Sequence, residues 1–411
     1  MEHIIKNDID IIINNKKNTP RTSVCFYFGI DEQEKFSGIY GLFAKLLLQG
    51  TKTKDAKTLA TELENNCIDV SIKAKQDYLK VSFLFLNEDF ELAMNYAKDI
   101  ILNSTFEEFE KEKFKMKGEI KADLDNPRIL ASDAFIRRLF EGHCYSNTAS
   151  KTLEELDKIK IEDIFEVHKQ ILNSRKVLSI AGDIKDNQNL ASYFAQNFDF
   201  MKSNKVASNI QKFEKFTPKE KNVEILKISK NDLNQAQVFQ GFIVPNVESE
   251  LYPKISVMNN ILGSSGLSSR LFVELRDKQG LAYTVRSSYE TLYKSAIFSF
   301  YIATEPKNIK KSLDGFREEL QKLANNPPSE DELKGAKENI TGKLEYFSQT
   351  NSQLASIEGF NYLMGLGINY SDKFIEMINK VNANDVCEAA KLILEKESLI
   401  CTLAPEKYLN F

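Results

Sequence analysis

Histidine is scarce in this sequence, which has only His3, His143 and His168 among 411 residues. None of the three has a second histidine four positions away, so no helical pair of imidazole zinc ligands is present. The five cysteines are scattered and form no Cys-x-x-Cys pair, which indicates neither a cysteine zinc site nor a disulfide framework. We therefore expect no metal or other cofactor to be held by this chain.

An excess of charge and a long apolar run are both missing. The net charge is −4, which gives no general attraction to nucleic acid or to an anionic membrane. No apolar run approaches the roughly 20 residues of a membrane-spanning helix. The N-terminal segment carries acids, including Glu2 and Asp8, where a secretory leader needs bases and an apolar block. We expect a cytoplasmic protein without nucleic-acid or membrane partners, and a periplasmic one only if a leader has been removed.

Hydrophobic residues make up 42% of the chain and charged residues 28%, a globular composition in a chain long enough for two or more domains. Strands and helices alternate in a pattern that predicts α+β layers rather than a doubly wound parallel sheet. The predicted strands are 4–13, 23–30, 68–74, 78–86, 176–181, 235–242, 282–289 and 296–303. The predicted helices are 37–49, 58–66, 90–102, 107–124, 252–262, 311–324 and 330–347.

The chain repeats itself at long range. A shift of 222 residues, the difference between positions 386 and 164, aligns the segment 164–172 with 386–394. The same shift aligns 177–181 with 399–403. A period of this length indicates duplicated domains rather than a solenoid. A polar, lysine-rich stretch separates the two copies, so we predict domains at 1–203 and 223–411 joined by a linker at 204–222.

The most informative stretch is Arg276–Tyr283, which reads Arg-Asp-Lys-Gln-Gly-Leu-Ala-Tyr. The residues before it are apolar at helical spacing, and Gly280 is the residue type that commonly ends a helix. Arg276 and Tyr283 therefore lie seven residues apart, across a tight turn from a helix end to a strand start. Taken alone, Arg276 could form a surface ion pair and Tyr283 could pack in the sheet.

This stretch closely resembles the C-terminal half of the pitrilysin-like (inverzincin, M16) metallopeptidases, and nearly the whole chain is similar to that family. The resemblance implies two homologous α+β domains that face each other around a chamber. Each would be an antiparallel-rich mixed sheet with helices packed on one face. It also implies that Arg276 and Tyr283 reach a zinc site and hold and polarise the substrate peptide bond. A guanidinium and a phenol can both donate to a carbonyl oxygen on which charge develops.

The zinc motif of the family is degenerate in this chain. Active members carry Gly-Leu/Ile-x-His-x-x-Glu-His-x-x-x-x-Gly-Thr, in which the histidines bind zinc and the glutamate activates water. The flanking Gly38-Ile39 and Gly50-Thr51 match this pattern and place Gly41, Ala44 and Lys45 at the three critical positions. Both imidazole ligands and the general base are therefore replaced.

Two glutamates remain on the next acidic helix. Glu112 and Glu119 are seven residues apart, and Glu119 falls 74 residues after Lys45, near the place of the family's carboxylate ligand. One carboxylate without the histidines makes a poor zinc site. We therefore expect Glu119 to pair with Lys45, and the alternative is that Glu112 and Glu119 are solvated helix charges.

The resemblance is strongest to the non-zinc subunits of two-chain, bacterial or mitochondrial-processing-peptidase-like members. We expect a subunit that is inactive alone and supplies Arg276 and Tyr283 in trans to a zinc-bearing partner, on an extended peptide. The partner would be a different chain in a heterodimer, or a second copy in a homodimer. The alternatives are a catalytically inactive peptide-binding or structural protein, and an independent zinc protease with a rearranged site.

Overall fold

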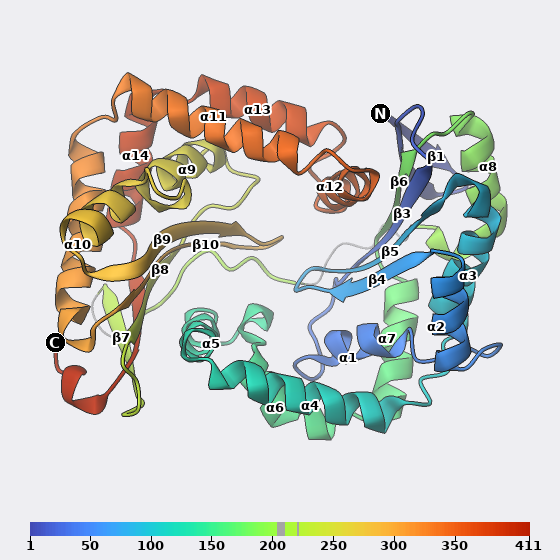
Figure 1. Ribbon diagram of the computed structural model, residues 1–411, viewed down its shortest axis with the longest axis horizontal. Coiled ribbons are helices and arrows are strands. Elements are labelled where there is room, and N and C mark those ends of the chain that lie inside the picture. Colours follow the sequence, from blue (N-terminus) through green and yellow to red (C-terminus); the bar gives the residue numbers. More distant parts are fainter. Residues whose placement is uncertain (204–209, 220–221) are drawn as a thin grey trace. The chain divides into compact units, whose positions relative to one another are not determined.

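The computed structural model describes residues 1–203, 210–219 and 222–411, which form two compact units (Figure 1). Unit 1 comprises Met1–Ile120, Lys151–Ile210 and Glu345–Tyr370. Unit 2 comprises Lys121–Ser150, Gln211–Leu344 and Ser371–Phe411. Each unit therefore includes a segment from the other half of the chain, a partition different from the predicted continuous domains. Parts of the predicted linker, residues 204–209 and 220–221, lie outside the described residues.

The sheet of unit 1 has the strand order β1-β2-β6-β3-β5-β4. The β2–β6 pair is parallel and the other neighbouring pairs are antiparallel. The strands are β1 Glu2–Lys6, β2 Ile9–Asn15, β3 Arg21–Gly29, β4 Asp69–Ala74, β5 Tyr78–Leu86 and β6 Lys176–Gly182. The single strand predicted for 4–13 is wrong. Asn7 and Asp8 adopt φ angles of 49° and 61° and form a two-residue hairpin turn, a conformation that these residue types tolerate.

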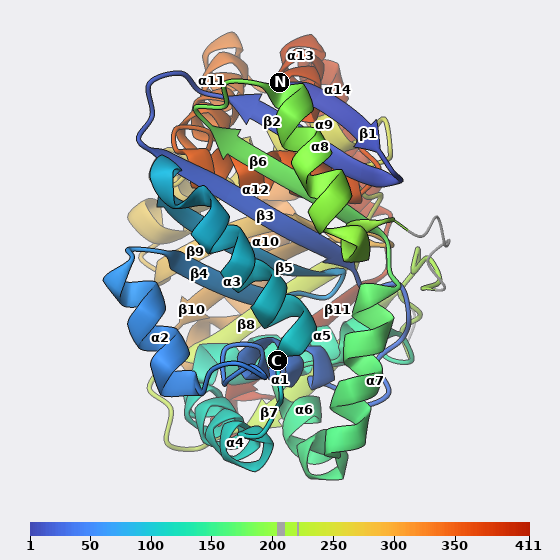
Figure 2. The same cartoon turned by 90° about the vertical axis from the view of Figure 1, so that its right-hand side faces the viewer.

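Helices cover both faces of this sheet. In Figure 2, α3 and α8 lie across its strands. Phe90 of α3 contacts Phe85 of β5 and Tyr193 of α8. Phe26 of β3 stacks on Phe198, the residue after α8. On the other face α12 contacts β3 and β6. The helices wholly or mainly in unit 1 are α1 Ile39–Leu46, α2 Ala56–Asn65, α3 Phe90–Asn103, α4 Phe109–Asp125, α6 Ala149–Glu155, α7 Ile161–Leu172, α8 Asn187–Asn197 and α12 Asn351–Leu363.

The sheet of unit 2 has the order β7-β11-β8-β10-β9, again with one parallel pair, β7–β11. Its strands are β7 Val223–Ser229, β8 Ala236–Ile243, β9 Ala282–Thr291, β10 Ala296–Thr304 and β11 Ser398–Ala404. Its helices are α5 Pro127–Leu139, α9 Tyr252–Asn259, α10 Ile309–Asn325, α11 Glu330–Tyr346, α13 Tyr370–Lys380 and α14 Ala383–Leu394. The predicted helix 252–262 is α-helical only to Asn259 and continues as a π-helical turn over Asn260–Ser264.

The predicted duplication is present in the structure. The bounds of β6 and α7, shifted by the 222 residues between positions 164 and 386, coincide with those of β11 and α14. The strand orders of the two sheets also correspond, with β1 as an addition to the first. The predicted α+β layers and antiparallel-rich mixed sheets are confirmed. The prediction placed helices on one face of each sheet, and the structure has an additional helix on the other face, α12 in unit 1 and α5 in unit 2.

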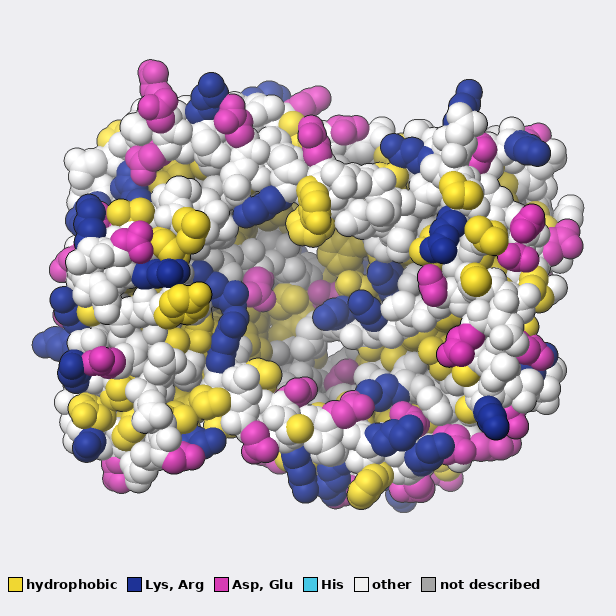
Figure 3. Space-filling model, viewed as in Figure 1, with side chains coloured by type: hydrophobic (Ala, Val, Ile, Leu, Met, Phe, Trp, Pro, Cys, Tyr) yellow, Lys and Arg dark blue, Asp and Glu magenta, His cyan; other side chains and the backbone are white. Residues whose placement is uncertain are grey.

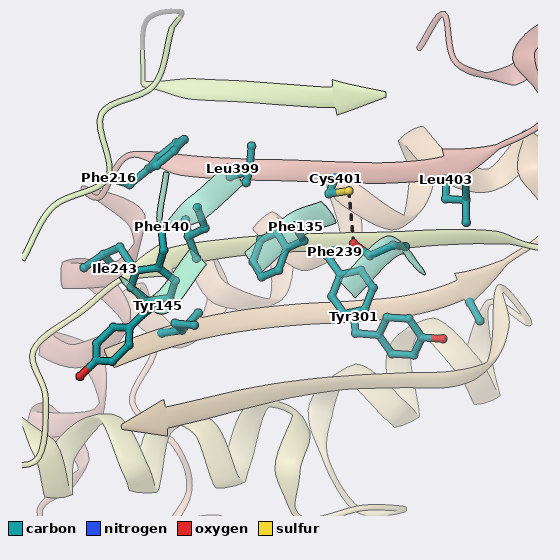
Figure 4. Close-up of a cluster of buried hydrophobic side chains, with 14 residues drawn as sticks. Phe135, Phe140, Tyr145, Phe216, Phe239, Ile243, Tyr301, Leu399, Cys401 and Leu403 are labelled. Carbon is teal, nitrogen blue, oxygen red and sulfur yellow. Dashed lines mark hydrogen bonds between the residues drawn. The ribbon is translucent and has the colours of Figure 1, made fainter. Parts of the chain in front are cut away.

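In unit 2, α5 covers β8 and β11 (Figure 4). Phe135 stacks on Phe239 with ring centroids 5.5 Å apart, and both belong to one buried apolar cluster. Gly241 allows this approach, because a Cβ there would lie 2.3 Å from the Phe135 ring. The helices α9, α10 and α14 pack together on the opposite face, where Phe300 stacks on Phe316 of α10.

Lysine, arginine, aspartate and glutamate side chains are interspersed over the surface seen in Figure 3, in keeping with the small net charge. Within the described ranges, no helix is both long enough and apolar enough to cross a bilayer.

Candidate functional site

Arg276 lies in a π-helical segment, Phe272–Lys278, where a regular α-helix was expected. The segment ends at Gly280, which adopts a left-handed φ of 60°. The Gly280 N–H donates to the Arg276 carbonyl at 3.0 Å, and the Leu281 N–H donates to the Leu275 carbonyl at 2.9 Å. These bonds close the helix end and turn the chain into β9, which begins at Ala282. Such π-helical turns are rare and often lie at functional sites.

The turn brings Tyr283 back against Arg276. The Arg276 Cζ lies 4.5 Å from the centroid of the Tyr283 ring and 4.2 Å from that of Phe272. Two aromatic rings thus hold one guanidinium by cation–π contacts. The Arg276 side chain is 30% exposed, and Tyr283 is 79% exposed. Sequence reasoning missed Phe272, although it stands four residues before Arg276 in the same apolar-periodic segment.

The contacts of Arg276 and Tyr283 argue against a simple surface ion pair for the arginine and against sheet packing for the tyrosine. The Asp277 carboxylate is 3.9 Å from Arg276 Nε, the outer limit of an ion pair, so Arg276 is restrained mainly by the rings. Tyr283 is too exposed to be a packing residue of the sheet. The partly exposed guanidinium carries several N–H donors, and the exposed phenol is a second kind of donor beside it.

The positions of the degenerate zinc motif lie on α1, beside α4. A Cβ at Gly41 would stand 3.4 Å from Met116 Cε of α4, and Ala44 is buried. The Lys45 Nζ donates to Glu119 Oε2 at 2.7 Å, with the two side chains 37% and 57% exposed. The predicted pairing of Lys45 with Glu119 is therefore present.

Glu112 is buried and differs from a solvated helix charge. Lys115, three residues later on α4, donates to Glu112 Oε1 at 2.6 Å. This hydrogen bond raises the pKa of Lys115. Each of these two glutamates is therefore paired with a lysine. The partner of Glu112 is Lys115 on the same helix, and the partner of Glu119 is Lys45 on α1.

The residues at these positions do not fit a zinc ion. Gly41 and Ala44 have no side-chain atom that could bind a metal. The Glu119 carboxylate, which would be the remaining ligand, forms an ion pair with the Lys45 ammonium. In the part of the chain that the structure describes, no group of three or more histidine, cysteine, aspartate or glutamate side chains could hold a metal ion.

The three histidines each have a separate role. His3 contacts the Asp10 carboxylate at 2.9 Å, and His143 contacts the Gln211 carbonyl at 2.9 Å. His168 Nε2 lies 2.6 Å from the Ile101 carbonyl, and burial lowers the pKa of this imidazole.

Comparison with known proteins agrees with this geometry. Residues 11–153 match the family model "Insulinase (Peptidase family M16)", and residues 158–340 match "Peptidase M16 inactive domain". The chain is 25% identical over 409 residues to a Bacillus subtilis protein named "Uncharacterized zinc protease YmxG", covering 97% of each chain. It is 26% identical to a Helicobacter pylori protein named "Non-peptidase homolog YmxG", covering 90% of this chain and 85% of the relative.

Solved structures show the same fold. A crystal structure described as the peptidase M16 inactive domain from Pseudomonas fluorescens superposes with a TM-score of 0.88 at 19% identity, covering 98% of both chains. A protease structure from Helicobacter pylori gives a TM-score of 0.86 at 18% identity, covering 98% of this chain and 99% of the other. The duplicated sheets, the matched models and the full-length relatives together place this chain in peptidase family M16.

Proposed function

We propose that this chain is the non-zinc subunit of a two-chain zinc peptidase and that it supplies Arg276 and Tyr283 to the partner's active site. One contrast carries the proposal: Arg276 and Tyr283 are in contact and exposed, whereas the zinc-motif positions hold Gly41, Ala44 and a Lys45–Glu119 ion pair. A subunit without any catalytic role would not need two aromatic rings, Phe272 and Tyr283, to restrain the guanidinium of Arg276.

The two side chains would act on the peptide bond of the substrate. The Arg276 guanidinium is planar and positively charged, so its N–H groups can hold a peptide carbonyl in one orientation. The Tyr283 phenol can donate a second hydrogen bond to the same oxygen as negative charge develops there. A zinc ion on the partner would supply the activated water. Because Phe272 and Tyr283 already restrain Arg276, little ordering would be needed when substrate binds.

Variants of the reconstituted complex test this role. Arg276→Ala and Tyr283→Phe should each lower kcat/KM for a peptide, by about 10²–10³-fold for a lost donor to the developing oxyanion. Subunit association, measured by native mass spectrometry, should stay unchanged. Arg317→Ala and Tyr346→Phe change exposed residues of the same types away from the turn and serve as matched controls. Full turnover by the Arg276→Ala complex would refute the proposal.

A second candidate is a catalytically inactive peptide-binding or structural protein. The observation that favours it is the name of the Helicobacter pylori relative, "Non-peptidase homolog YmxG". In that case Arg276 and Tyr283 would contribute to peptide binding or to the fold, and their substitution would leave the hydrolysis rate of any complex unaffected. An independent zinc protease is disfavoured because Gly41 and Ala44 lack side-chain metal ligands and Lys45 is a cation paired with Glu119.

A further inference from the structure

Two arginines converge on one tyrosine ring, on the face of the unit 2 sheet that α5 partly covers. Tyr301 of β10 lies directly opposite Arg286 of β9, so both side chains leave the sheet on the same face. Arg128 reaches this face from the first turn of α5. Figure 4 shows Tyr301 at the margin of the apolar cluster, beside Phe239 and with its hydroxyl directed away from Phe135.

Neither arginine has an acidic partner among the residues that the structure describes. The Cζ atoms of Arg128 and Arg286 lie 4.9 Å and 5.6 Å from the centroid of the Tyr301 ring. Over the described ranges, no carboxylate oxygen lies within 4.0 Å of either guanidinium. By contrast, Arg138 and Arg270 of the same unit each make two hydrogen bonds to a glutamate. Arg128 and Arg286 are both exposed, so a ligand can reach them.

The positive charge of this cluster is only partly compensated. Burial lowers the pKa of Arg286, and the neighbouring charge of Arg128 lowers it further. Glu290, farther along β9, opposes this effect but is beyond ion-pair distance. Two like charges that share one ring repel each other, and a bound anion would relieve that repulsion.

The guanidinium groups are the donors that remain for such an anion. The first backbone N–H groups of α5 are already used, because Asn126 Oδ1 accepts from Arg128 N at 3.0 Å and from Ile129 N at 3.5 Å. The Tyr301 hydroxyl donates to Gln237 Oε1 at 2.7 Å. Both guanidinium groups lie over the Tyr301 ring, and the helix end is not itself the site.

We infer that Arg128 and Arg286 form a carboxylate-binding site that selects acidic peptides. Guanidinium forks match a carboxylate with paired, charge-assisted hydrogen bonds. The peptide would reach the site along β9, which is an edge strand and carries both Tyr283 and Arg286. An edge strand can pair with an extended peptide through its free backbone groups. The inference rests on the peptide binding of the proposed function and adds the class of side chain that this chain prefers.

Binding to the purified chain, without partner or zinc, tests the site. The probes are two labelled peptides, one of alternating serine and glutamate and one of alternating serine and glutamine, so that the variable residues share one face. Fluorescence anisotropy should show the glutamate peptide binding at least about tenfold tighter. The double variant Arg128→Gln/Arg286→Gln should remove this preference, and Arg317→Gln should keep it. Equal binding of both peptides, or a preference that survives in the double variant, would overturn the inference.

A measurement on the unaltered chain covers the case in which the double variant fails to fold. Phenylglyoxal modifies accessible arginines, and mass spectrometry should show that the glutamate peptide protects Arg128 and Arg286 whereas the glutamine peptide does not. Unprotected arginines would count against the site. If inorganic phosphate displaces the peptide better than acetate at equal ionic strength, the site binds inorganic anions and the peptide assignment fails. Arg276 and Tyr283 are intact throughout, so these outcomes leave the proposed catalytic role untouched.

Discussion

Lys176 is a lysine buried in the central part of the first sheet, on β6, with 4% of its surface exposed. Its Nζ donates to the carbonyls of Leu172 at 2.6 Å and Phe200 at 2.9 Å, without a carboxylate partner among the described residues. Burial therefore lowers the pKa of Lys176 to about 8. Burying the charged form of Lys176 lowers the free energy of unfolding, and this loss disappears when the lysine is deprotonated.

This cost predicts a pH dependence of stability. The unfolded chain keeps the lysine protonated up to roughly pH 10.4, so above about pH 8 the unfolded state binds more protons and stability rises with pH. Relative to Lys176→Met, the unaltered chain should gain on the order of 1 kcal/mol of unfolding free energy per pH unit in this window. Urea unfolding at several pH values measures this gain, and parallel profiles of the two proteins would contradict it.

At the scale of single elements, α12 shows how closely a helix from one half of the sequence is fitted to the sheet of unit 1. The Tyr27 hydroxyl donates to the Ser356 carbonyl at 2.7 Å. A Cβ at Gly359 would stand 2.6 Å from Tyr27 Cε2 and 2.9 Å from Ser179 Cβ. No real side chain fits that gap without a shift of the helix or the strand.

Gly359→Ala should therefore destabilise unit 1 by about 1–3 kcal/mol, the usual range for overpacking. Gly118→Ala is the matched control, because a Cβ at this α4 position meets no atom within 4 Å. There the higher helix propensity of alanine should stabilise the protein by up to about 1 kcal/mol. Thermal or urea unfolding of the two variants gives the comparison. Equal effects would show that α12 does not pack as described.

The helices α1 and α4 lead to a second prediction at this scale. Their contacts place position 41 beside Met116 of α4 and Lys45 beside Glu119, so restoring the missing donors should restore a metal site. The triple variant Gly41→His/Ala44→Glu/Lys45→His should bind zinc in stoichiometric amount, measured by competition with a colorimetric chelator. Ala44→Glu alone, which adds no imidazole, is the control and should bind none. Failure of the triple variant would mean that the two helices no longer hold the spacing of a zinc site.

The elements also show what the sequence could and could not reveal. Apolar periodicity predicted the bounds of α3, α4, α10 and α11 to within about two residues, because this signal is local in the chain. The helices α5 and α12 were missed, although Asn126-Pro127 and the Thr350–Gln353 capping box are recognisable helix starts. Their positions on the opposite sheets depend on long-range packing that local pattern does not encode. The π-helical turn at Arg276 was missed because π- and α-helices have similar apolar patterns.

At the scale of the whole molecule, two features of the chain stand in contrast. The residues at the zinc-motif positions cannot supply a metal site, yet the fold is that of the family and Arg276 and Tyr283 stay exposed and in contact. Motif comparison could reveal both features, because each depends on a few residues close in sequence. The Arg128–Arg286 cluster could not be predicted, since its residues lie far apart in the chain and meet only through β9, β10 and α5.

A native pull-down from cells that naturally make this chain tests whether it associates with a zinc-bearing partner subunit. We expect a near-stoichiometric partner of similar size whose sequence carries an intact His-x-x-Glu-His, because zinc chemistry must then come from a second chain. The isolated chain should hydrolyse no peptide when zinc is added, and the reconstituted pair should do so in a chelator-sensitive manner. Recovery of this chain alone, or as a homodimer without hydrolysis, would favour the binding or structural alternative. Chelator-sensitive cleavage by the isolated chain would refute the division of labour, because the zinc ligands would then have to lie within this chain.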